Sequence, residues 1–246
     1  MNRRLVSLLC VGALACSPSG SPPSTAETDA PASAAPVQEP SRPDAPADEP
    51  VVVFLGTSLT AGLGLLRSED TYVSILAEMA DSAGLPMDAV NAGVSGDTSA
   101  GGLRRLDWVL REPVDILVVE LGANDGLRGQ DPDATEQNLL TIVEKARSRY
   151  PGIRVVIAGM EAPPNLGSAY TRRFHDIFPD VARQTGAALV PFLLEDVAGI
   201  PALNQADGIH PNPEGERIVA HNVWPVLEPL LRAWKVEHAA ASGGGS

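Results

Sequence analysis

Short apolar runs alternate with longer amphipathic segments from residue 51 onward, and this alternation restricts the fold more than any other feature. The first run, VVVFL, is apolar on both faces and predicts a strand that is buried on both sides. The segments between such runs carry apolar residues at helical spacing. Buried strands separated by helices indicate a parallel sheet with helices on each face, so we predict a three-layer α/β/α domain.

Five strands and five helices are expected in this domain. The predicted strands are Val51–Leu55, Met87–Asn91, Val114–Leu121, Ile153–Gly159 and Ala187–Pro191. The predicted helices are Thr71–Ala83, Ser99–Leu110, Thr135–Tyr150, Tyr170–Thr185 and one that begins near Pro213. Right-handed crossovers favour the flavodoxin-like strand order 2-1-3-4-5. We expect Asp133 to cap the third helix and Asn212, which precedes Pro213, to cap the last.

The N-terminal segment has the composition of an export signal. Two arginines precede LVSLLCVGALA, an apolar stretch that is too short to span a bilayer but suits the apolar region of a signal peptide. ALAC, which ends at Cys16, resembles a bacterial lipoprotein signal, although Ala13 stands where that motif usually has Leu. We therefore predict a signal peptide at 1–15 and a lipid-anchored protein in the bacterial periplasm or at the outer membrane. Ordinary secretory cleavage, which gives a soluble periplasmic or secreted protein, is the alternative.

Composition divides the rest of the chain. Residues 16–50 are rich in Pro, Ala, Ser and acidic side chains and predict a disordered tether that begins at the lipidated Cys16. Residues 51–236 form the predicted domain, and 237–246 a flexible tail. The membrane is thus expected as a partner, through the N-terminal anchor alone, and the domain is expected to be a monomer.

Charge and cysteine content exclude several functions. The net charge is −13, and it becomes −15 when Arg3 and Arg4 leave with the signal peptide, so nucleic acid is not an expected partner. Both cysteines, Cys10 and Cys16, lie in the N-terminal segment. The mature domain therefore has no disulfide, thiol nucleophile or cysteine metal site, and no metal or organic cofactor is implied.

Three loops that follow predicted strands carry residues suited to catalysis. The first strand continues into GTSLT, the second into NAGVSGDTS and the third into ELGANDGLRG. These strands are neighbours in the predicted order, and ligands bind at the carboxyl edge of such sheets. We therefore expect Ser58, Gly96 and Asn124 to converge on one cleft. The backbone N–H groups of Ser58 and Gly96 and the side-chain amide of Asn124 can together form an oxyanion hole.

A serine nucleophile needs a base, and the base needs an orienting acid. The sequence DGIHP places Asp207 three residues before His210, so the carboxylate and the imidazole can meet within one turn. The other histidines, His175, His221 and His238, are expected to be surface or packing residues. Asp207 as a helix cap beside an exposed histidine is the structural alternative.

These motifs resemble one family. The order and spacing of four motifs, GTSL, the glycine of VSGDTS, GAND and DGIHP, resemble those of the SGNH branch of GDSL hydrolases. Two longer segments, ELGANDGLRG and VPFLLEDV, further resemble exported bacterial esterases of the thioesterase, lysophospholipase and arylesterase type. The resemblance implies that Ser58 is the nucleophile, His210 the base and Asp207 its partner, with Gly96 and Asn124 in the oxyanion hole. Thr57 departs from the family pattern, which has Asp before the serine, and we expect it to tune the nucleophile loop.

The predicted function is a serine esterase that hydrolyses aryl esters, lysophospholipids or acyl thioesters through an acyl-enzyme intermediate. Apolar residues near the site, Leu63, Leu65, Leu66 and Ile200–Leu203, would suit an acyl chain, although they could equally be core residues. A polysaccharide O-deacetylase of the same fold is one alternative, because its motifs would be the same. A lipid-anchored binding protein with a vestigial site is the other.

Overall fold

A five-stranded parallel sheet organises the domain. The computed structural model describes residues 49–243 of the 246-residue chain. The sheet has the order β2-β1-β3-β4-β5, which confirms the predicted flavodoxin-like arrangement. Its strands are β1 (Val51–Gly56), β2 (Asp88–Gly93), β3 (Ile116–Glu120), β4 (Arg154–Ala158) and β5 (Ala188–Val190).

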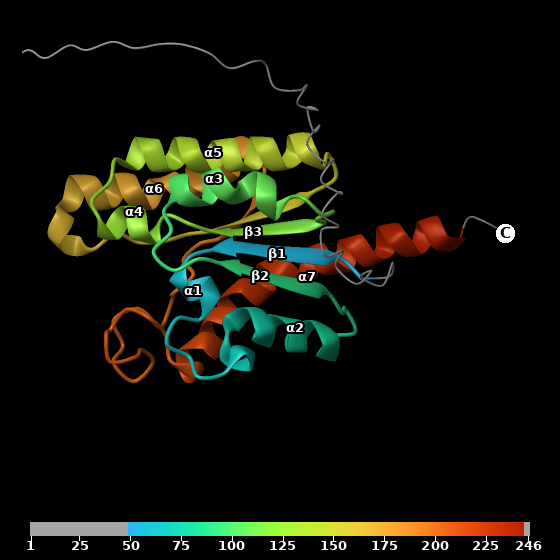
Figure 1. Cartoon of the computed structure of the whole chain (residues 1–246), viewed down its shortest axis with the longest axis horizontal. Helices are drawn as coiled ribbons and strands as arrows, with labels where there is room; N and C mark the ends of the chain where they lie inside the picture. Colours follow the sequence, from blue (N-terminus) through green and yellow to red (C-terminus); the bar gives the residue numbers. More distant parts are fainter. Residues whose placement is uncertain (1–48, 244–246) are drawn as a thin grey trace, which may run out of the picture. The chain divides into compact units, whose positions relative to one another are not determined.

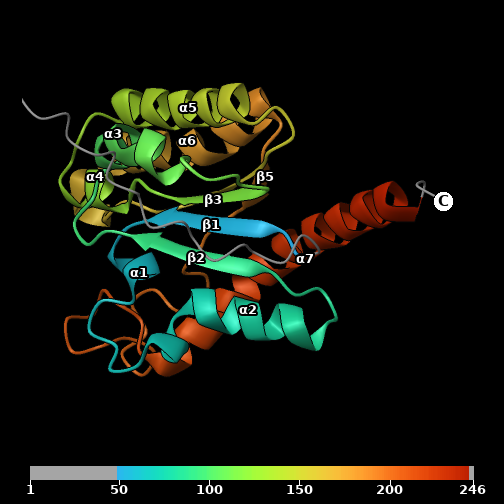
Figure 2. The same cartoon turned by 45° about the vertical axis from the view of Figure 1, so that its right-hand side comes forward.

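Helices cover both faces of this sheet. On one face lie α3 (Ser99–Val109), α5 (Pro132–Arg149) and α6 (Ser168–Thr185), and on the other lie α2 (Tyr72–Ser82) and α7 (Pro213–Gly243) (Figures 1 and 2). Every residue of the central strand β3 is buried, because helices shield it on both sides. The three predicted layers are therefore present.

Two short helices at the carboxyl edge were not predicted. They are α1 (Ser58–Ala61) and α4 (Ala123–Leu127), and they begin shortly after β1 and β3 end. Two single turns of 3-10 helix, Ser68–Asp70 and Pro164–Leu166, were also missed. Segments of three to five residues are too short to show helical periodicity, so their sequence carries no signal of this kind.

The two predicted helix caps had different outcomes. Asn212 accepts hydrogen bonds from the backbone N–H groups of Glu214 and Gly215, at 3.0 and 3.1 Å, which confirms it as the cap of α7. The prediction for Asp133 was wrong, because Asp131 caps α5 and Pro132 is its first residue. Proline suits the first helical position, since its fixed φ matches the helix and it has no N–H to satisfy.

The last helix is longer than predicted. α7 continues to Gly243, so residues 237–243 of the expected flexible tail are helical. Glu237 pairs with Arg154 at 2.6 Å, and His238 stacks on Trp234 with ring centroids 3.8 Å apart. These contacts hold the added turns. The predicted signal peptide, Cys16 and all but the last two residues of the predicted tether lie outside the described residues.

None of the helices in the described part of the chain combines the length and the apolar character needed to cross a membrane.

Candidate active site

The strand register brings the three candidate loops to one edge of the sheet. Gly56, the last residue of β1, pairs with Gly93 at the end of β2 and with Glu120 at the end of β3. Ser58 follows β1 by two residues, and Asn124 follows β3 by four. Because neighbouring parallel strands end together, their loops emerge side by side, with α1 and α4 at the same edge (Figure 2).

Ser58, His210 and Asp207 form a continuous chain of hydrogen bonds. The Oγ of Ser58 lies 2.8 Å from Nε2 of His210, and Nδ1 of His210 lies 2.7 Å from Oδ2 of Asp207. Ser58 is 9% exposed, so most of its surface is covered by neighbouring residues. The structure thus brings together three residues that the sequence separates into two distant motifs.

The loop that carries His210 is stabilised by its own aspartate. Oδ1 of Asp207 accepts hydrogen bonds from the backbone N–H groups of Ile209 and His210, at 2.9 and 3.0 Å, while Gly208 takes a left-handed φ of +69°. The hydrogen bonds from Ile209 and His210 lower the pKa of Asp207 to about 2. The carboxylate therefore stays ionised at neutral pH and can orient the imidazole.

This arrangement determines the proton positions at the site. An ionised carboxylate only accepts hydrogen bonds, so Nδ1 of His210 must carry the proton that points to Asp207. In the neutral ring Nε2 is then an acceptor, and the hydroxyl of Ser58 donates to it. That is the starting geometry for a histidine that removes the proton of a serine.

Gly96 and Asn124 are linked to each other through the loop between β2 and α3. The side-chain amide of Asn124 donates to the carbonyl of Asp97 at 2.8 Å, and Arg128 donates to the carbonyl of Gly96 at 2.9 Å. Gly96 has a φ of +79°, which favours glycine. Within the described residues neither Gly96 nor Asn124 hydrogen-bonds to Ser58, and the aligned ends of β1, β2 and β3 are what brings their loops to the same sheet edge.

Arg105 holds these loops in place and was not predicted. From α3 its guanidinium donates to the carbonyls of Ala92 and Gly56, at 2.7 and 2.8 Å, and to the carboxylate of Asp97 at 2.7 Å. One side chain thus joins the ends of β1 and β2 to the loop that carries Gly96. A single arginine on a helix gives no such signal in the sequence.

The other three histidines contact groups outside the hydrogen-bonded chain of Ser58, His210 and Asp207. His175 pairs with Glu161 at 2.5 Å, and that carboxylate raises the pKa of His175. His221 and His238 lie within 2.7 and 2.9 Å of backbone carbonyls of their own helix.

The apolar residues near the site are mostly exposed and not part of the core. Leu63 is 47% exposed, Leu66 is 99% exposed and Ile200 is 40% exposed. Gln205 joins the two segments that carry them, because its amide donates to the carbonyls of Leu63 and Pro211, at 2.8 and 2.9 Å. An accessible apolar surface therefore lies on segments that are continuous with Ser58 and His210.

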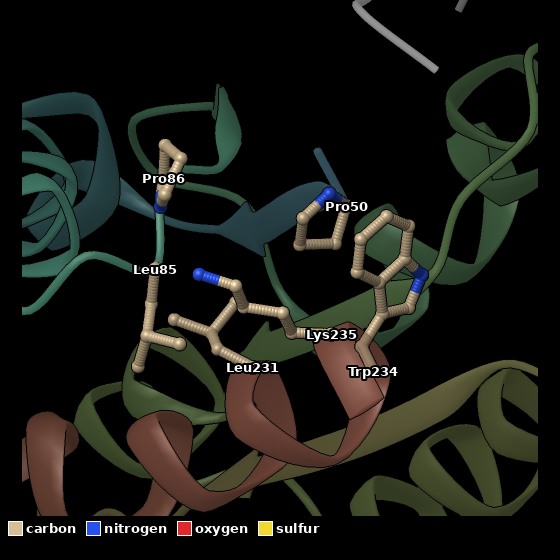
Figure 3. Close-up of a pocket in the computed structure, with 6 residues that line it drawn as sticks. All are labelled: Pro50, Leu85, Pro86, Leu231, Trp234 and Lys235. Carbon is tan, nitrogen blue, oxygen red and sulfur yellow. The ribbon is translucent and has the colours of Figure 1, made fainter. Parts of the chain in front are cut away.

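A small apolar pocket lies at the opposite edge of the sheet. It has a volume of about 60 Å³ and is lined by Pro50, Leu85, Pro86, Leu231, Trp234 and Lys235 (Figure 3). Pro50 and Pro86 precede β1 and β2, so the pocket is at the amino ends of these strands. Pockets for small molecules usually have about 300 Å³ or more, so this one is too small to be an alternative substrate site.

The described residues contain no group of three or more His, Cys, Asp or Glu side chains placed to hold a metal ion.

One protein family matches the part of the chain that contains these residues. The model of the GDSL-like lipase/acylhydrolase family matches residues 54–218. The match runs from β1 into α7 and includes Ser58, Gly96, Asn124, Asp207 and His210.

Individual relatives are similar over most of their length. Esterase TesA of Pseudomonas aeruginosa is 45% identical over 181 residues, which cover 73% of this chain and 89% of the relative. Thioesterase 1/protease 1/lysophospholipase L1 of Escherichia coli K12 is 37% identical over 184 residues, which cover 73% and 84%. Among solved structures, a crystal structure of TesA has a TM-score of 0.69 at 42% identity and covers 73% of this chain and 99% of that one.

Proposed function

Since this chain belongs to the GDSL-like lipase/acylhydrolase family and is a serine ester hydrolase, we propose that Ser58 is its nucleophile, His210 its general base and Asp207 the residue that orients His210. The observation that carries these assignments is the chain of hydrogen bonds from Ser58 through His210 to Asp207, at 2.8 and 2.7 Å. A vestigial binding site would not need this chain.

The reaction proceeds in two stages. Nε2 of His210 takes the proton of Ser58 as Oγ attacks the ester carbonyl, and Asp207 stabilises the imidazolium that forms. His210 then gives that proton to the departing alcohol, which leaves the acyl group on Ser58. In the second stage His210 removes a proton from water, the water attacks the acyl-enzyme, and the proton returns to Ser58 as the carboxylic acid leaves.

Three donors stabilise the negative oxygen in this scheme. They are the backbone N–H groups of Ser58 and Gly96 and the side-chain amide of Asn124. Neither backbone N–H has a hydrogen-bond acceptor among the described residues, and Asn124 uses one of its two amide hydrogens on Asp97. All three groups therefore retain a hydrogen for the oxyanion.

The substrate class follows from the accessible apolar residues and from the relatives. Leu63, Leu66 and Ile200 are exposed beside the segments that carry Ser58 and His210, and they favour an ester with an acyl chain. The similar proteins bear the names esterase and thioesterase/lysophospholipase. We assign aryl esters, lysophospholipids and acyl thioesters as the substrates to test, with acetylated polysaccharide as the alternative.

Export and anchoring are part of this proposal. The apolar segment before Cys16 supports a signal peptide, and Cys16 is the candidate lipidation site. Incorporation of labelled palmitate into the full-length chain, and its loss in Cys16→Ser, would support the anchor. A secreted, unlabelled protein would support ordinary cleavage instead.

Hydrolysis of p-nitrophenyl esters from acetyl to palmitoyl tests the activity. Residues 49–246 as wild type and as Ser58→Ala are compared, with Ser148→Ala as a matched control because Ser148 lies at the end of α5 that leads to the amino end of β4. We expect Ser58→Ala to lose about four or more decades of kcat and the control to lose none.

The two possible failures have separate meanings. Equal activity of Ser58→Ala and wild type would contradict the assigned nucleophile. If the wild-type domain hydrolyses no ester of any length but releases acetate from acetylated glycans, the deacetylase is the function.

A further inference from the structure

A fully buried carboxylate accepts hydrogen bonds from the residues on both sides of the candidate nucleophile. Glu120 is the last residue of β3 and is 0% exposed. Its Oε2 accepts hydrogen bonds from the backbone N–H of Thr57 at 2.7 Å and from the hydroxyl of Thr60 at 2.8 Å. Its Oε1 accepts one from the hydroxyl of Thr57 at 3.0 Å. A longer contact of 3.3 Å joins Oε2 to the backbone N–H of Thr60.

The donors come from both sides of Ser58. Thr57 precedes the serine directly and Thr60 follows it by two residues, and both are 0% exposed. Four N–H and O–H groups of one short turn thus converge on a single carboxylate. We call this set of contacts, between Glu120 and the turn 57–60, the Glu120 clamp.

A tyrosine extends the clamp into the core. The hydroxyl of Tyr72 lies 2.7 Å from that of Thr60. Because Thr60 donates its hydrogen to Glu120, Tyr72 must be the donor to Thr60. Hydrogen bonds in such a chain polarise one another, and a satisfied buried network makes its surroundings rigid.

The residue at the end of β1 leaves room for the clamp. A Cβ on Gly56 would lie 1.9 Å from Oγ1 of Thr60 and 2.7 Å from Oε2 of Glu120. Any side chain at position 56 would therefore displace the two partners. The glycine in GTSLT thus leaves the space that the clamp occupies.

We propose that Glu120 is a positioning residue for Ser58, which it keeps at hydrogen-bonding distance from His210 by holding both flanks of the nucleophile turn. The inference rests on the proposed role of Ser58 as nucleophile. It also gives a function to Thr57, whose hydroxyl donates to the clamp where the GDSL pattern has an aspartate. Glu120 is also the last residue of β3, and the chain reaches Asn124 four residues later. The Glu120 clamp therefore joins the turn that carries the nucleophile to the strand end that leads to the oxyanion donor.

The physical reason is the sensitivity of the reaction to geometry. A displacement of about 1 Å at a reacting group can cost about a hundredfold in rate. α1 has only four residues, so its own hydrogen bonds cannot hold Ser58 rigidly. Contacts from outside the turn must do so, and the Glu120 clamp supplies them on both sides.

The test separates positioning from simple stabilisation of the fold. Wild type, Glu120→Gln, Thr57→Val and Thr57→Ser are compared by kcat and KM on p-nitrophenyl butyrate and by reaction with a p-nitrophenyl phosphonate. The phosphonate burst amplitude counts intact sites, and its rate reports the reactivity of Ser58. Asp115→Asn is the matched control, because the carboxylate of Asp115 also accepts a hydrogen bond from a backbone N–H of β1, that of Val51 at 2.8 Å, but at the amino end of the strand, opposite to the end that leads to Ser58.

The expected result is a loss of rate without a loss of sites. Glu120→Gln should lower kcat and the phosphonylation rate by about ten- to a hundredfold, and Thr57→Val by about tenfold, with KM nearly unchanged. Thr57→Ser keeps the hydroxyl and should retain most of the activity, and Asp115→Asn should keep the wild-type kcat. If Glu120→Gln does not fold, the Thr57→Val and Thr57→Ser pair decides.

Three outcomes would overturn the inference. If kcat per titrated site stays within about twofold of wild type in both Glu120→Gln and Thr57→Val, the cluster serves only the fold. If Asp115→Asn loses as much rate as Glu120→Gln, the effect is not specific to the clamp. If the wild type neither hydrolyses the ester nor reacts with the phosphonate, the proposed function fails first.

Discussion

The side-chain amide of Asn124 uses one of its two N–H groups within the structure, and in the proposed mechanism the other binds the oxyanion. Its Nδ2 donates to the carbonyl of Asp97 at 2.8 Å, which fixes the direction of the second N–H. A donor held in this way stabilises developing charge without having to reorganise during the reaction. The sequence motif GAND identified the residue, but the carbonyl that orients it lies in another loop.

Replacement of Asn124 by alanine should therefore lower kcat by about two to three decades while KM changes little, because the lost interaction belongs to the transition state. Steady-state kinetics on p-nitrophenyl butyrate measures this. Asn222→Ala is the matched control, since its amide donates to the carbonyls of Leu193 and Glu195, at 3.1 and 2.9 Å, and neither of these is a proposed site residue. Comparable losses in the two variants would show that general destabilisation is the cause.

At the scale of the elements, Asp125 joins three helices. It lies in α4, is 1% exposed, and accepts hydrogen bonds from the backbone N–H and the hydroxyl of Ser99 in α3, at 2.9 and 2.5 Å. The hydroxyl of Thr135 in α5 contacts it at 3.3 Å. The short helix that carries Asn124 is thus held to its neighbours through one buried carboxylate.

Asp125→Asn should lower the free energy of unfolding by about 2–3 kcal/mol, because an amide cannot accept all of these hydrogen bonds and leaves a buried donor unpaired. Urea unfolding measures the change. The control is Asp107→Asn, whose partner Lys145 is on the surface, and it should cost at most about 1 kcal/mol. Equal effects in the two variants would contradict the role of Asp125.

For the whole molecule, the buried carboxyl groups make stability depend on pH. Burial, together with the charge of Glu120, raises the pKa of Glu216 from 4.5 to about 8, although the backbone N–H of Tyr72 opposes the rise. Burial likewise raises the pKa of Glu120 to about 7, against the hydrogen bonds from Thr57 and Thr60. Between pH 4.5 and about 8 the folded state therefore keeps protons that the unfolded state releases, and this difference in proton binding stabilises the fold. The stabilisation is complete below pH 4.5 and is lost as pH rises through about 8.

The melting temperature should accordingly fall between about pH 5 and about pH 9, by roughly 2–4 °C for each kcal/mol that is lost. Glu216→Gln should reduce this fall, because its amide oxygen still accepts from Tyr72 but does not titrate. Thermal unfolding at several pH values measures both slopes. Identical slopes in wild type and variant would show that Glu216 does not carry the effect. Asp207 changes stability with pH in the opposite direction. Its lowered pKa stabilises the folded state above pH 3.8, and this stabilisation is lost as the pH falls to about 2.

Local patterns were sufficient wherever a structure depends on neighbouring residues. Runs such as VVVFL, which are apolar on both faces of the strand, predicted buried strands, because a strand covered by helices on both sides needs apolar side chains on both of its faces. Asn212 before Pro213 predicted the start of the last helix, because capping uses adjacent groups. The family motifs named Ser58, Asp207 and His210, and the structure joins these residues by hydrogen bonds.

Contacts between distant residues were decided only by the tertiary structure. Glu120 ends an apolar run and looks like any strand end, and Arg105 looks like any exposed helix position, until the register of β1, β2 and β3 aligns Gly56, Gly93 and Glu120. The sequence alone determined which residues can do the chemistry, because that depends on their functional groups. What holds those groups in place depends on the distances between strand ends, and these exist only once the sheet has formed.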